Sequence, residues 1–165
     1  MTAPSPTWTT LPHAPLCIAE FEVAGGILPL GRSPFGERRV GYITGGHFEG
    51  ERLRGAILPG GGNWSTTGEV PGGAAGTFDA RSVWRTHDGA LISVSYAGRS
   101  VIPPDVGAAF RDPAQPHVDP SRYYLRIAPV FETSDPRYAW LNGVLAVSCG
   151  ERLPTGVRHT MFEVL

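Results

Sequence analysis

The chain has 165 residues, the usual size of one domain and too short for two ordinary ones. Hydrophobic residues make up 41% and charged residues 18%, so the chain can bury a core and is not expected to be globally disordered. A net charge of -1 and a pI near 6.5 argue against nucleic acid as the main partner, because phosphate binding leaves a basic footprint.

The N-terminal segment MTAPSPTWTTLPHAP lacks the basic start and apolar middle of a signal peptide. No part of the chain approaches the roughly 20 consecutive apolar residues of a membrane-spanning helix, so no membrane partner is expected. We therefore expect residues 1–15 to form a flexible tail, residues 16–165 to form one domain, and the location to be cytoplasmic by default.

The first structured run is Leu16 to Val23, an apolar stretch that is typical of a strand. Arg38 to Phe48 alternates apolar and polar residues, and Gly45-Gly46 within it indicates a bulge or a tight barrel bend. Leu53 to Leu58 follows after a turn, which predicts a hairpin.

Two glycine-rich stretches, residues 59–62 and 70–76, are expected to be loops. After them comes the clearest hairpin in the chain. It pairs Thr77 to Arg85 with Ala90 to Tyr96 through His87-Asp88-Gly89, because Asp-Gly is a strong turn signal between two strand-like runs.

Residues 102–120 hold five prolines, and only Pro104 to Phe110 could form a short helical piece. This segment is either a lid over a pocket mouth or a surface excursion. Three further strand-like runs end the chain, namely Tyr123 to Thr133, Ala139 to Ser148 and Arg158 to Val164.

The runs add up to about eight strands in mostly neighbour-to-neighbour order, with little helix. This pattern predicts an all-β fold, a single antiparallel barrel first and a sandwich second. A barrel of that size can hold one small ligand in its interior. Any strand edge left unpaired would invite a second copy of the chain, so a homo-oligomer is also an expectation.

Two cysteines, Cys17 and Cys149, lie in apolar runs and are expected to be buried free thiols, with a disulfide as the alternative. The sequence has no HExxH, G-x-S-x-G, P-loop or dinucleotide-binding pattern. His47 with Glu49 and His117 with Asp119 each supply only two metal-ligand types, so neither a metal nor a cofactor is expected.

Strand alternation places Asp79 and Arg81 on one face and Phe78, Ala80 and Trp84 on the other. If the face of Asp79 and Arg81 is the barrel lumen, a carboxylate beside a guanidinium would anchor a polar substrate. If it is the outside, the pair is ordinary surface charge of small value.

On the predicted strand 139–148, Trp140 and Asn142 share a face and could supply a stacking wall and an amide to a ligand. The alternative is a core tryptophan beside an asparagine that caps a turn. The phenols of Tyr42, Tyr96, Tyr123 and Tyr124 are further candidate proton donors.

Three runs taken together resemble the DUF3237 family (domain of unknown function 3237, of the UPF0311 type), namely TGGHFEGERLRGAILPGGGNW, FDARSVWRTHDGALISV and YAWLNGVLAV. The match extends over roughly residues 16 to 165. The resemblance implies a calycin-like antiparallel barrel and favours the lumen position of Asp79 and Arg81. It also implies five pocket residues, which are Asp79, Arg81, Trp64, Trp140 and Asn142.

Where the family pattern has aspartate before the tryptophan, this chain has Asn63. Asparagine keeps the shape and one acceptor of aspartate but cannot carry its charge or act as a general base. The family has no settled activity, so the resemblance itself gives no function.

Two functions from different classes therefore stay open. The first is a cofactor-independent isomerase, cyclase or lyase acting on a small oxygenated, aromatic or polyketide-like metabolite inside the barrel. In it Asp79 is the general base, Arg81 and Asn63 stabilise developing negative charge, and the substrate is bound by Trp64, Trp140, Asn142, Tyr96 and Tyr124. The second is a lipocalin-like binding protein that holds a small molecule without changing it.

Overall fold

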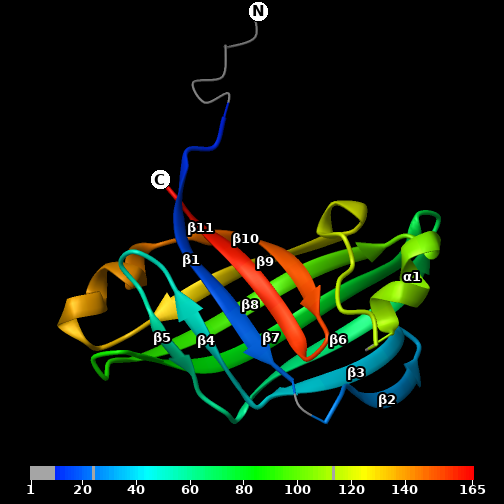
Figure 1. The fold of residues 1–165 in the computed structure, drawn as a ribbon, viewed down its shortest axis with the longest axis horizontal. Helices are drawn as coiled ribbons and strands as arrows, with labels where there is room; N and C mark the ends of the chain where they lie inside the picture. Colours follow the sequence, from blue (N-terminus) through cyan, green and yellow to red (C-terminus); the bar gives the residue numbers. More distant parts are fainter. Residues whose placement is uncertain (1–9, 24, 113) are drawn as a thin grey trace, which may run out of the picture.

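A computed structural model of the chain describes residues 10–23, 25–112 and 114–165. In these described residues eleven strands form one sheet, and eight of them close an antiparallel barrel in the order β7, β5, β4, β1, β11, β10, β9, β8 and back to β7 (Figure 1). The strands are β1 (His13–Glu22), β2 (Leu28–Ser33), β3 (Gly36–Ile43), β4 (Gly45–Glu49), β5 (Gly55–Ile57), β6 (Gly61–Val70), β7 (Gly73–Thr86), β8 (Leu91–Ile102), β9 (Tyr124–Glu132), β10 (Ala146–Leu153) and β11 (Gly156–Val164). The helices are α1 (Pro104–Arg111) and two 3₁₀ segments, η1 (Pro120–Arg122) and η2 (Pro136–Gly143). The predicted barrel fold is confirmed.

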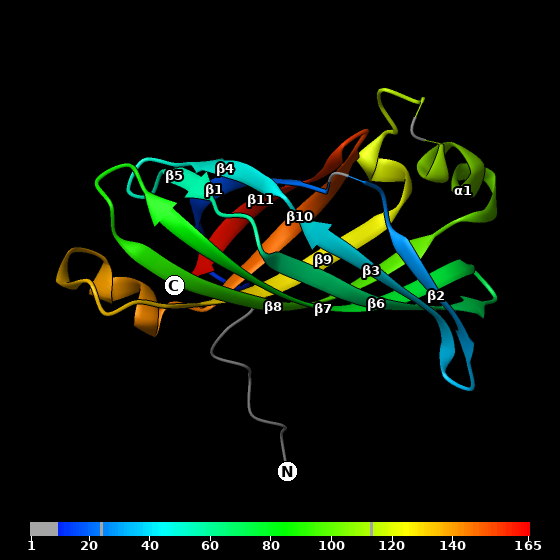
Figure 2. The same cartoon turned by 90° about the horizontal axis from the view of Figure 1, so that it is seen from below.

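The three strands outside the barrel, β2, β3 and β6, extend the sheet from one half of β7. The long strand β7 pairs with β6 along its N-terminal part and with β5 near its C-terminal end. Figure 2 shows β2 and β3 leaving the barrel wall at one corner. In the described part of the chain, β2 ends the strand order and pairs only with β3. The homo-oligomer expected at such an edge stays a prediction.

Aromatic side chains fill the part of the barrel between β4, β7 and β9. Trp84 is fully buried and stacks on Phe48 with ring centroids 4.4 Å apart, while Phe131 packs edge-on against the same indole at 5.9 Å. Alternation along β7 then turns Ala80, Ser82 and Trp84 inward and the residues between them outward. The bulk of Trp84 therefore decides which face of β7 is the lumen.

The two ends of the barrel are covered differently. At one end lies η2, and at the other lies α1 (Figure 1). The segment between β8 and β9, with α1 and η1 in it, packs over a second small core that is separate from the barrel core, made of Ile102, Val106, Val118, Tyr123 and Leu125. Phe78 and Val157 pack against both cores, so they lie between the barrel interior and this cover. The helical piece expected near residues 104–110 is confirmed as α1.

Several sequence-based boundaries are wrong. No strand was expected where β6 lies, and β7 starts at Gly73, inside the expected loop 70–76. β1 starts at His13, inside the expected tail. Residues 1–9 of that tail lie outside the described part of the chain. The break predicted at Gly45-Gly46 falls where β3 ends and β4 begins.

The expected strand 139–148 is also wrong, because its first half is the 3₁₀ segment η2. Pro136 begins η2, and the Asp135 carboxylate accepts a hydrogen bond from the Arg137 backbone N–H at 3.0 Å, which fixes a helical start.

The two cysteines differ in burial. Cys17 is a buried free thiol, and its burial raises its pKa to about 12. Cys149 is also a free thiol, but the expectation that it is buried is wrong. Side chains alternate along β10, and because Ser148 points inward, Cys149 points outward. No helix in the described ranges is long and apolar enough to cross a membrane.

Candidate functional site

Asp79 and Arg81 face the outside of the barrel, so the predicted lumen position is wrong. Both side chains are exposed, whereas Ala80 between them is fully buried. Trp64 lies directly opposite Asp79 on β6 and is 43% exposed. Sequence alternation grouped Asp79 and Arg81 correctly. Which face of β7 turns into the barrel is set by Trp84, which shares the inward face with Ala80 four residues earlier.

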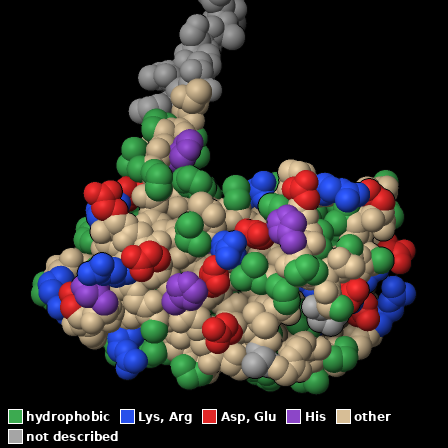
Figure 3. Space-filling model, viewed as in Figure 1, with side chains coloured by type: hydrophobic (Ala, Val, Ile, Leu, Met, Phe, Trp, Pro, Cys, Tyr) green, Lys and Arg blue, Asp and Glu red, His purple; other side chains and the backbone are tan. Residues whose placement is uncertain are grey.

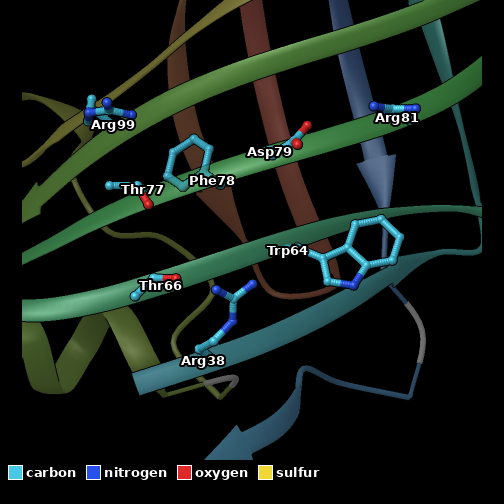
Figure 4. A pocket seen from close by; sticks show the side chains of 8 residues that line it. All are labelled: Arg38, Trp64, Thr66, Thr77, Phe78, Asp79, Arg81 and Arg99. Atoms are coloured by element: carbon cyan, nitrogen blue, oxygen red, sulfur yellow. The ribbon is translucent and has the colours of Figure 1, made fainter. Parts of the chain in front are cut away.

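These three residues share an open hollow on the outer surface of the sheet, called the outer hollow below. Its volume is about 620 Å³, and its lining is Arg38, Trp64, Thr66, Thr77, Phe78, Asp79, Arg81 and Arg99 (Figure 4). The structure thus brings together Trp64, Asp79 and Arg81, as the family resemblance implied, but on the opposite side of the wall.

A different polar group lies on the face of the sheet that turns toward the lumen, and it is called the inner cluster below. It consists of Asn63 on the extension strand β6 and of Tyr96, Ser148 and His159 in the barrel. Asn63 on β6 lies opposite Ala80 on β7, and Ala80 lies opposite Tyr96 on β8. Directly opposed residues share a face, so the amide and the phenol flank the small Ala80 methyl group, with Cα atoms roughly 10 Å apart, two strand spacings.

His159 and Ser148 come from the facing strands β11 and β10. The Oγ atom of Ser148 and Nδ1 of His159 are 2.9 Å apart, and the imidazole centroid is 6.1 Å from that of Tyr96. His159 is only 2% exposed, and this burial lowers its pKa to about 3, so the ring is neutral near pH 7. Phe21 packs against both rings, 5.8 Å from Tyr96 and 6.0 Å from His159.

Tyr96 and Asn63 keep unused hydrogen-bonding capacity. Tyr96 is 4% exposed, burial raises its pKa well above the usual range, and no described residue shares a hydrogen bond with its hydroxyl. Asn63 Oδ1 is buried without a hydrogen-bond partner among the described residues. Buried polar atoms are nearly always paired, so the unpaired Asn63 carbonyl is a candidate contact for a ligand.

Trp140 and Asn142 lie on η2, at the end of the barrel opposite α1 (Figure 1). The Asn142 amide accepts from the Thr133 backbone N–H at 2.9 Å and donates to its carbonyl at 3.0 Å. The Trp140 ring is covered by the Arg52 guanidinium at 4.2 Å. These contacts hold η2 against the end of β9, so neither side chain joins the other predicted site residues.

Tyr124 is 48% exposed on the outer face of β9, where the Arg126 guanidinium lies 4.9 Å from its ring centroid. It lines a second outer hollow of about 430 Å³ together with Arg99 and Arg126. Tyr124 is therefore separated by the barrel wall from Tyr96, with which the sequence had grouped it.

His159 and Ser148 were not among the predicted site residues. Each lies in a predicted strand, and alternation shows only that His159 shares a face with Met161. Their contact depends on the pairing register of β10 with β11, which no spacing in the sequence reveals. In the described residues there is no group of three or more histidine, cysteine, aspartate and glutamate side chains placed to hold a metal ion.

The chain matches, over residues 14–164, the family model described as protein of unknown function (DUF3237). It belongs to this family. A UPF0311 protein of Clostridium acetobutylicum is 32% identical over 129 residues, which are 78% of each chain. A β-barrel-like protein of Acinetobacter baumannii has a solved structure with a TM-score of 0.80 and 32% identity, covering 100% of both chains.

A more distant solved structure is described as an enzyme from Penicillium herquei. It is 22% identical to this chain with a TM-score of 0.69, and the match covers 100% of this chain and 99% of the other. At that identity the likeness shows the barrel fold alone. The family itself is one of unknown function.

Proposed function

We propose that this family member is a cofactor-independent enzyme that performs acid–base chemistry on a small oxygenated, ring-bearing metabolite bound at the inner cluster. The observation that carries the proposal is the row from Asn63, whose Oδ1 atom is buried without a partner, across the buried Ala80 to the buried Tyr96, with the neutral His159 ring 6.1 Å from that of Tyr96. Among the described residues, Asn63 Oδ1 is a buried side-chain atom without a hydrogen-bond partner, and such an atom costs stability unless a ligand pairs with it.

The chemistry of these groups specifies a neutral ligand with both a hydroxyl and a carbonyl. The protonated Tyr96 phenol donates to a carbonyl oxygen, and Asn63 Oδ1 accepts from a hydroxyl. No member of the cluster carries a charge, so a buried anion would lack compensation. Phe21, edge-on to Tyr96 and His159, supplies the apolar contact that suits a ring.

Proton transfer is assigned to His159. When Nδ1–H donates to Ser148 Oγ, the Nε2 atom carries a lone pair that can remove a proton from the bound molecule. The negative charge that develops on the bound molecule beside the ring raises the low pKa of His159 during this step. The Tyr96 hydroxyl stabilises the negative charge that then develops on the carbonyl oxygen. Isomerisation, cyclisation and elimination all begin with this step. Asp79, the base suggested by the sequence, lies outside the barrel and takes no part.

A lipocalin-like binding protein is the second candidate, and Asn63 favours it. The family pattern described above has aspartate at this position, and an amide cannot exchange a proton as a carboxylate does. If that aspartate is the family's base, this chain binds the same class of molecule without transforming it.

The test is native mass spectrometry of the purified protein against a panel of aromatic hydroxyketones and lactones, followed by analysis of each recovered ligand. We expect a ligand whose affinity falls about tenfold in Tyr96→Phe, because a buried hydrogen bond is lost. Tyr124→Phe, which changes an exposed phenol on the outer wall, is the matched control and should bind as the parent does.

Turnover separates the two candidates. A ligand that is chemically changed by the parent and returned unchanged by His159→Gln supports the enzyme. A ligand returned unchanged by the parent as well supports the binding protein. Equal binding by the parent and Tyr96→Phe would overturn the inner cluster as the site for either function.

A further inference from the structure

The outer hollow has its own chemistry, which the proposed function does not use. One cross-strand row runs over its floor from Arg38 on β3, through Thr66 on β6 and Thr77 on β7, to Arg99 on β8. Residues paired in this way point to the same side of the sheet. Two threonine hydroxyls thus lie between two arginines whose Cα atoms are roughly 14 Å apart, three strand spacings. Figure 4 shows Arg38 reaching from β3 toward β6.

The arginines of this surface lack acidic partners. Within the described residues, no ion pair joins Arg38, Arg81 or Arg99 to a carboxylate, and the lining of the outer hollow includes one acid, Asp79. The row continues to Arg126, directly opposite Arg99 on β9. Like charges in directly opposed positions destabilise a sheet unless an anion lies between or near them.

Elsewhere on the barrel the same kind of row is neutralised. Arg158 on β11 lies between Glu20 and Glu151 on its neighbouring strands and pairs with them at 2.7 and 3.2 Å. Figure 3 shows basic, acidic and histidine side chains interspersed on the face in view. The concentration of cations at the outer hollow is therefore a local feature in a chain of net charge -1.

An aromatic surface stands at the other side of the hollow. The edge of the Trp64 indole lies over Gly62, where an added Cβ would be 3.0 Å from its Cη2 atom, so the ring occupies space that a side chain at this position would need. Trp64 is opposite Asp79, and Arg81 follows Asp79 on the same face of β7 (Figure 4). An exposed tryptophan between arginines offers a stacking face to a planar ring.

We propose that the outer hollow binds a planar aromatic anion, with its phosphate or carboxylate between Arg38 and Arg99 and its ring on Trp64. The Thr66 and Thr77 hydroxyls donate to the anionic oxygens, and Asp79 accepts from a hydroxyl or amino group on the ring. The hollow, at about 620 Å³, has the size of small-molecule sites. This site is independent of the inner cluster, which takes an uncharged molecule on the other side of the wall.

Single-stranded nucleic acid uses the same phosphate and stacking contacts, but the net charge of -1 and the hollow volume of about 620 Å³ favour a small ligand. The two are separated by calorimetric titration with phenyl phosphate, 4-hydroxybenzoate, benzyl alcohol and an oligothymidylate. We expect at least one of the two aromatic anions to bind and benzyl alcohol, which has the ring without the charge, not to bind.

Variants locate the binding. Arg99→Gln should weaken the anion about tenfold, the loss of one charge-assisted hydrogen bond, and Trp64→Ala should weaken it by a similar factor. Arg85→Gln is the matched control, because Arg85 is also exposed and outward on β7 but does not line the hollow. Its affinity should stay within about twofold of the parent. Tyr96→Phe should also leave it unchanged, so this result does not depend on the inner cluster.

Three outcomes would overturn the proposal. The first is that neither aromatic anion binds. The second is equal weakening in Arg85→Gln and Arg99→Gln, which would mean attraction by net charge alone. The third is affinity that rises with oligothymidylate length above that of either small anion, which would assign the surface to nucleic acid.

Discussion

Burial, and not a neighbouring charged group, lowers the pKa of His159. Its pKa is lowered to about 3 in the folded protein, whereas an exposed histidine titrates near 6.5. Between these values the unfolded chain binds a proton that the folded chain does not. The stability that the neutral ring contributes is therefore complete above about pH 6.5 and is lost as the pH falls toward 3.

We expect the parent to lose about 1.4 kcal/mol of unfolding free energy per pH unit more than His159→Gln does as the pH falls below 6. Urea unfolding at a series of pH values measures both slopes. His47→Gln removes an exposed histidine and should keep the slope of the parent. Identical slopes for the parent and His159→Gln would mean that His159 is accessible to protons in the folded state.

Asn63 illustrates the conflict between stability and binding at a single residue. Its Oδ1 atom is buried without a partner in the described structure, which costs free energy that a ligand hydroxyl would recover. Asn63→Val removes the unpaired carbonyl and adds a β-branched residue to β6. We expect unfolding free energy to rise by up to about 1 kcal/mol while binding at the inner cluster is lost. A stability loss instead would show that the amide is satisfied in solution.

Among the elements, the junction of β1 and β4 depends on a glycine. Gly46 has φ of +141°, and a Cβ there would lie 2.0 Å from the Glu20 carbonyl oxygen. We expect Gly46→Ala to cost more than about 3 kcal/mol, since both the backbone conformation and the neighbouring strand oppose it. Gly68→Ala, in open space on β6, should change stability by less than about 1 kcal/mol. Thermal unfolding of both variants checks the contrast.

The sequence predicts an element well where its own residues determine the conformation. The β7–β8 hairpin follows from alternation and Asp88-Gly89, and Asp88 also accepts hydrogen bonds from Thr86 and Tyr138 at 2.5 and 3.0 Å. β6 was missed because glycines and polar residues dominate it, and its extended form comes from pairing with both β3 and β7. For η2 the reverse holds, because an apolar run is held helical by a cap and by Asn142.

Site residues divide in the same way. Strand alternation correctly put Asp79 and Arg81 together, and the register of β6 adds Trp64 to them. The face that enters the lumen depends on the stacking of Trp84 with Phe48, a contact between β7 and β4 that sequence spacing does not contain. The meeting of Ser148 with His159 likewise requires the three-dimensional register.

At the scale of the whole molecule, the segment between β8 and β9 controls one end of the barrel. The Arg152 side chain, buried on β10, donates to the backbone carbonyls of Asp112 and Gln115, and its backbone N–H donates to the Tyr123 hydroxyl at 2.9 Å. These bonds fasten the segment to the barrel. The sequence left it open whether this segment is a lid or a surface excursion, and its packing over Phe78 supports the lid.

We expect Arg152→Met to release the lid without unfolding the barrel, because methionine keeps the apolar stem and removes both side-chain hydrogen bonds. Amide exchange across α1 should accelerate about tenfold or more, the effect of losing hydrogen bonds worth roughly 1 kcal/mol each. Arg111→Gln, an exposed change on α1 itself, should leave exchange unchanged. If a ligand reaches the inner cluster past this lid, its association rate with Arg152→Met should be higher than with the parent. If amide exchange accelerates but the association rate stays the same, the entrance lies elsewhere in the barrel wall.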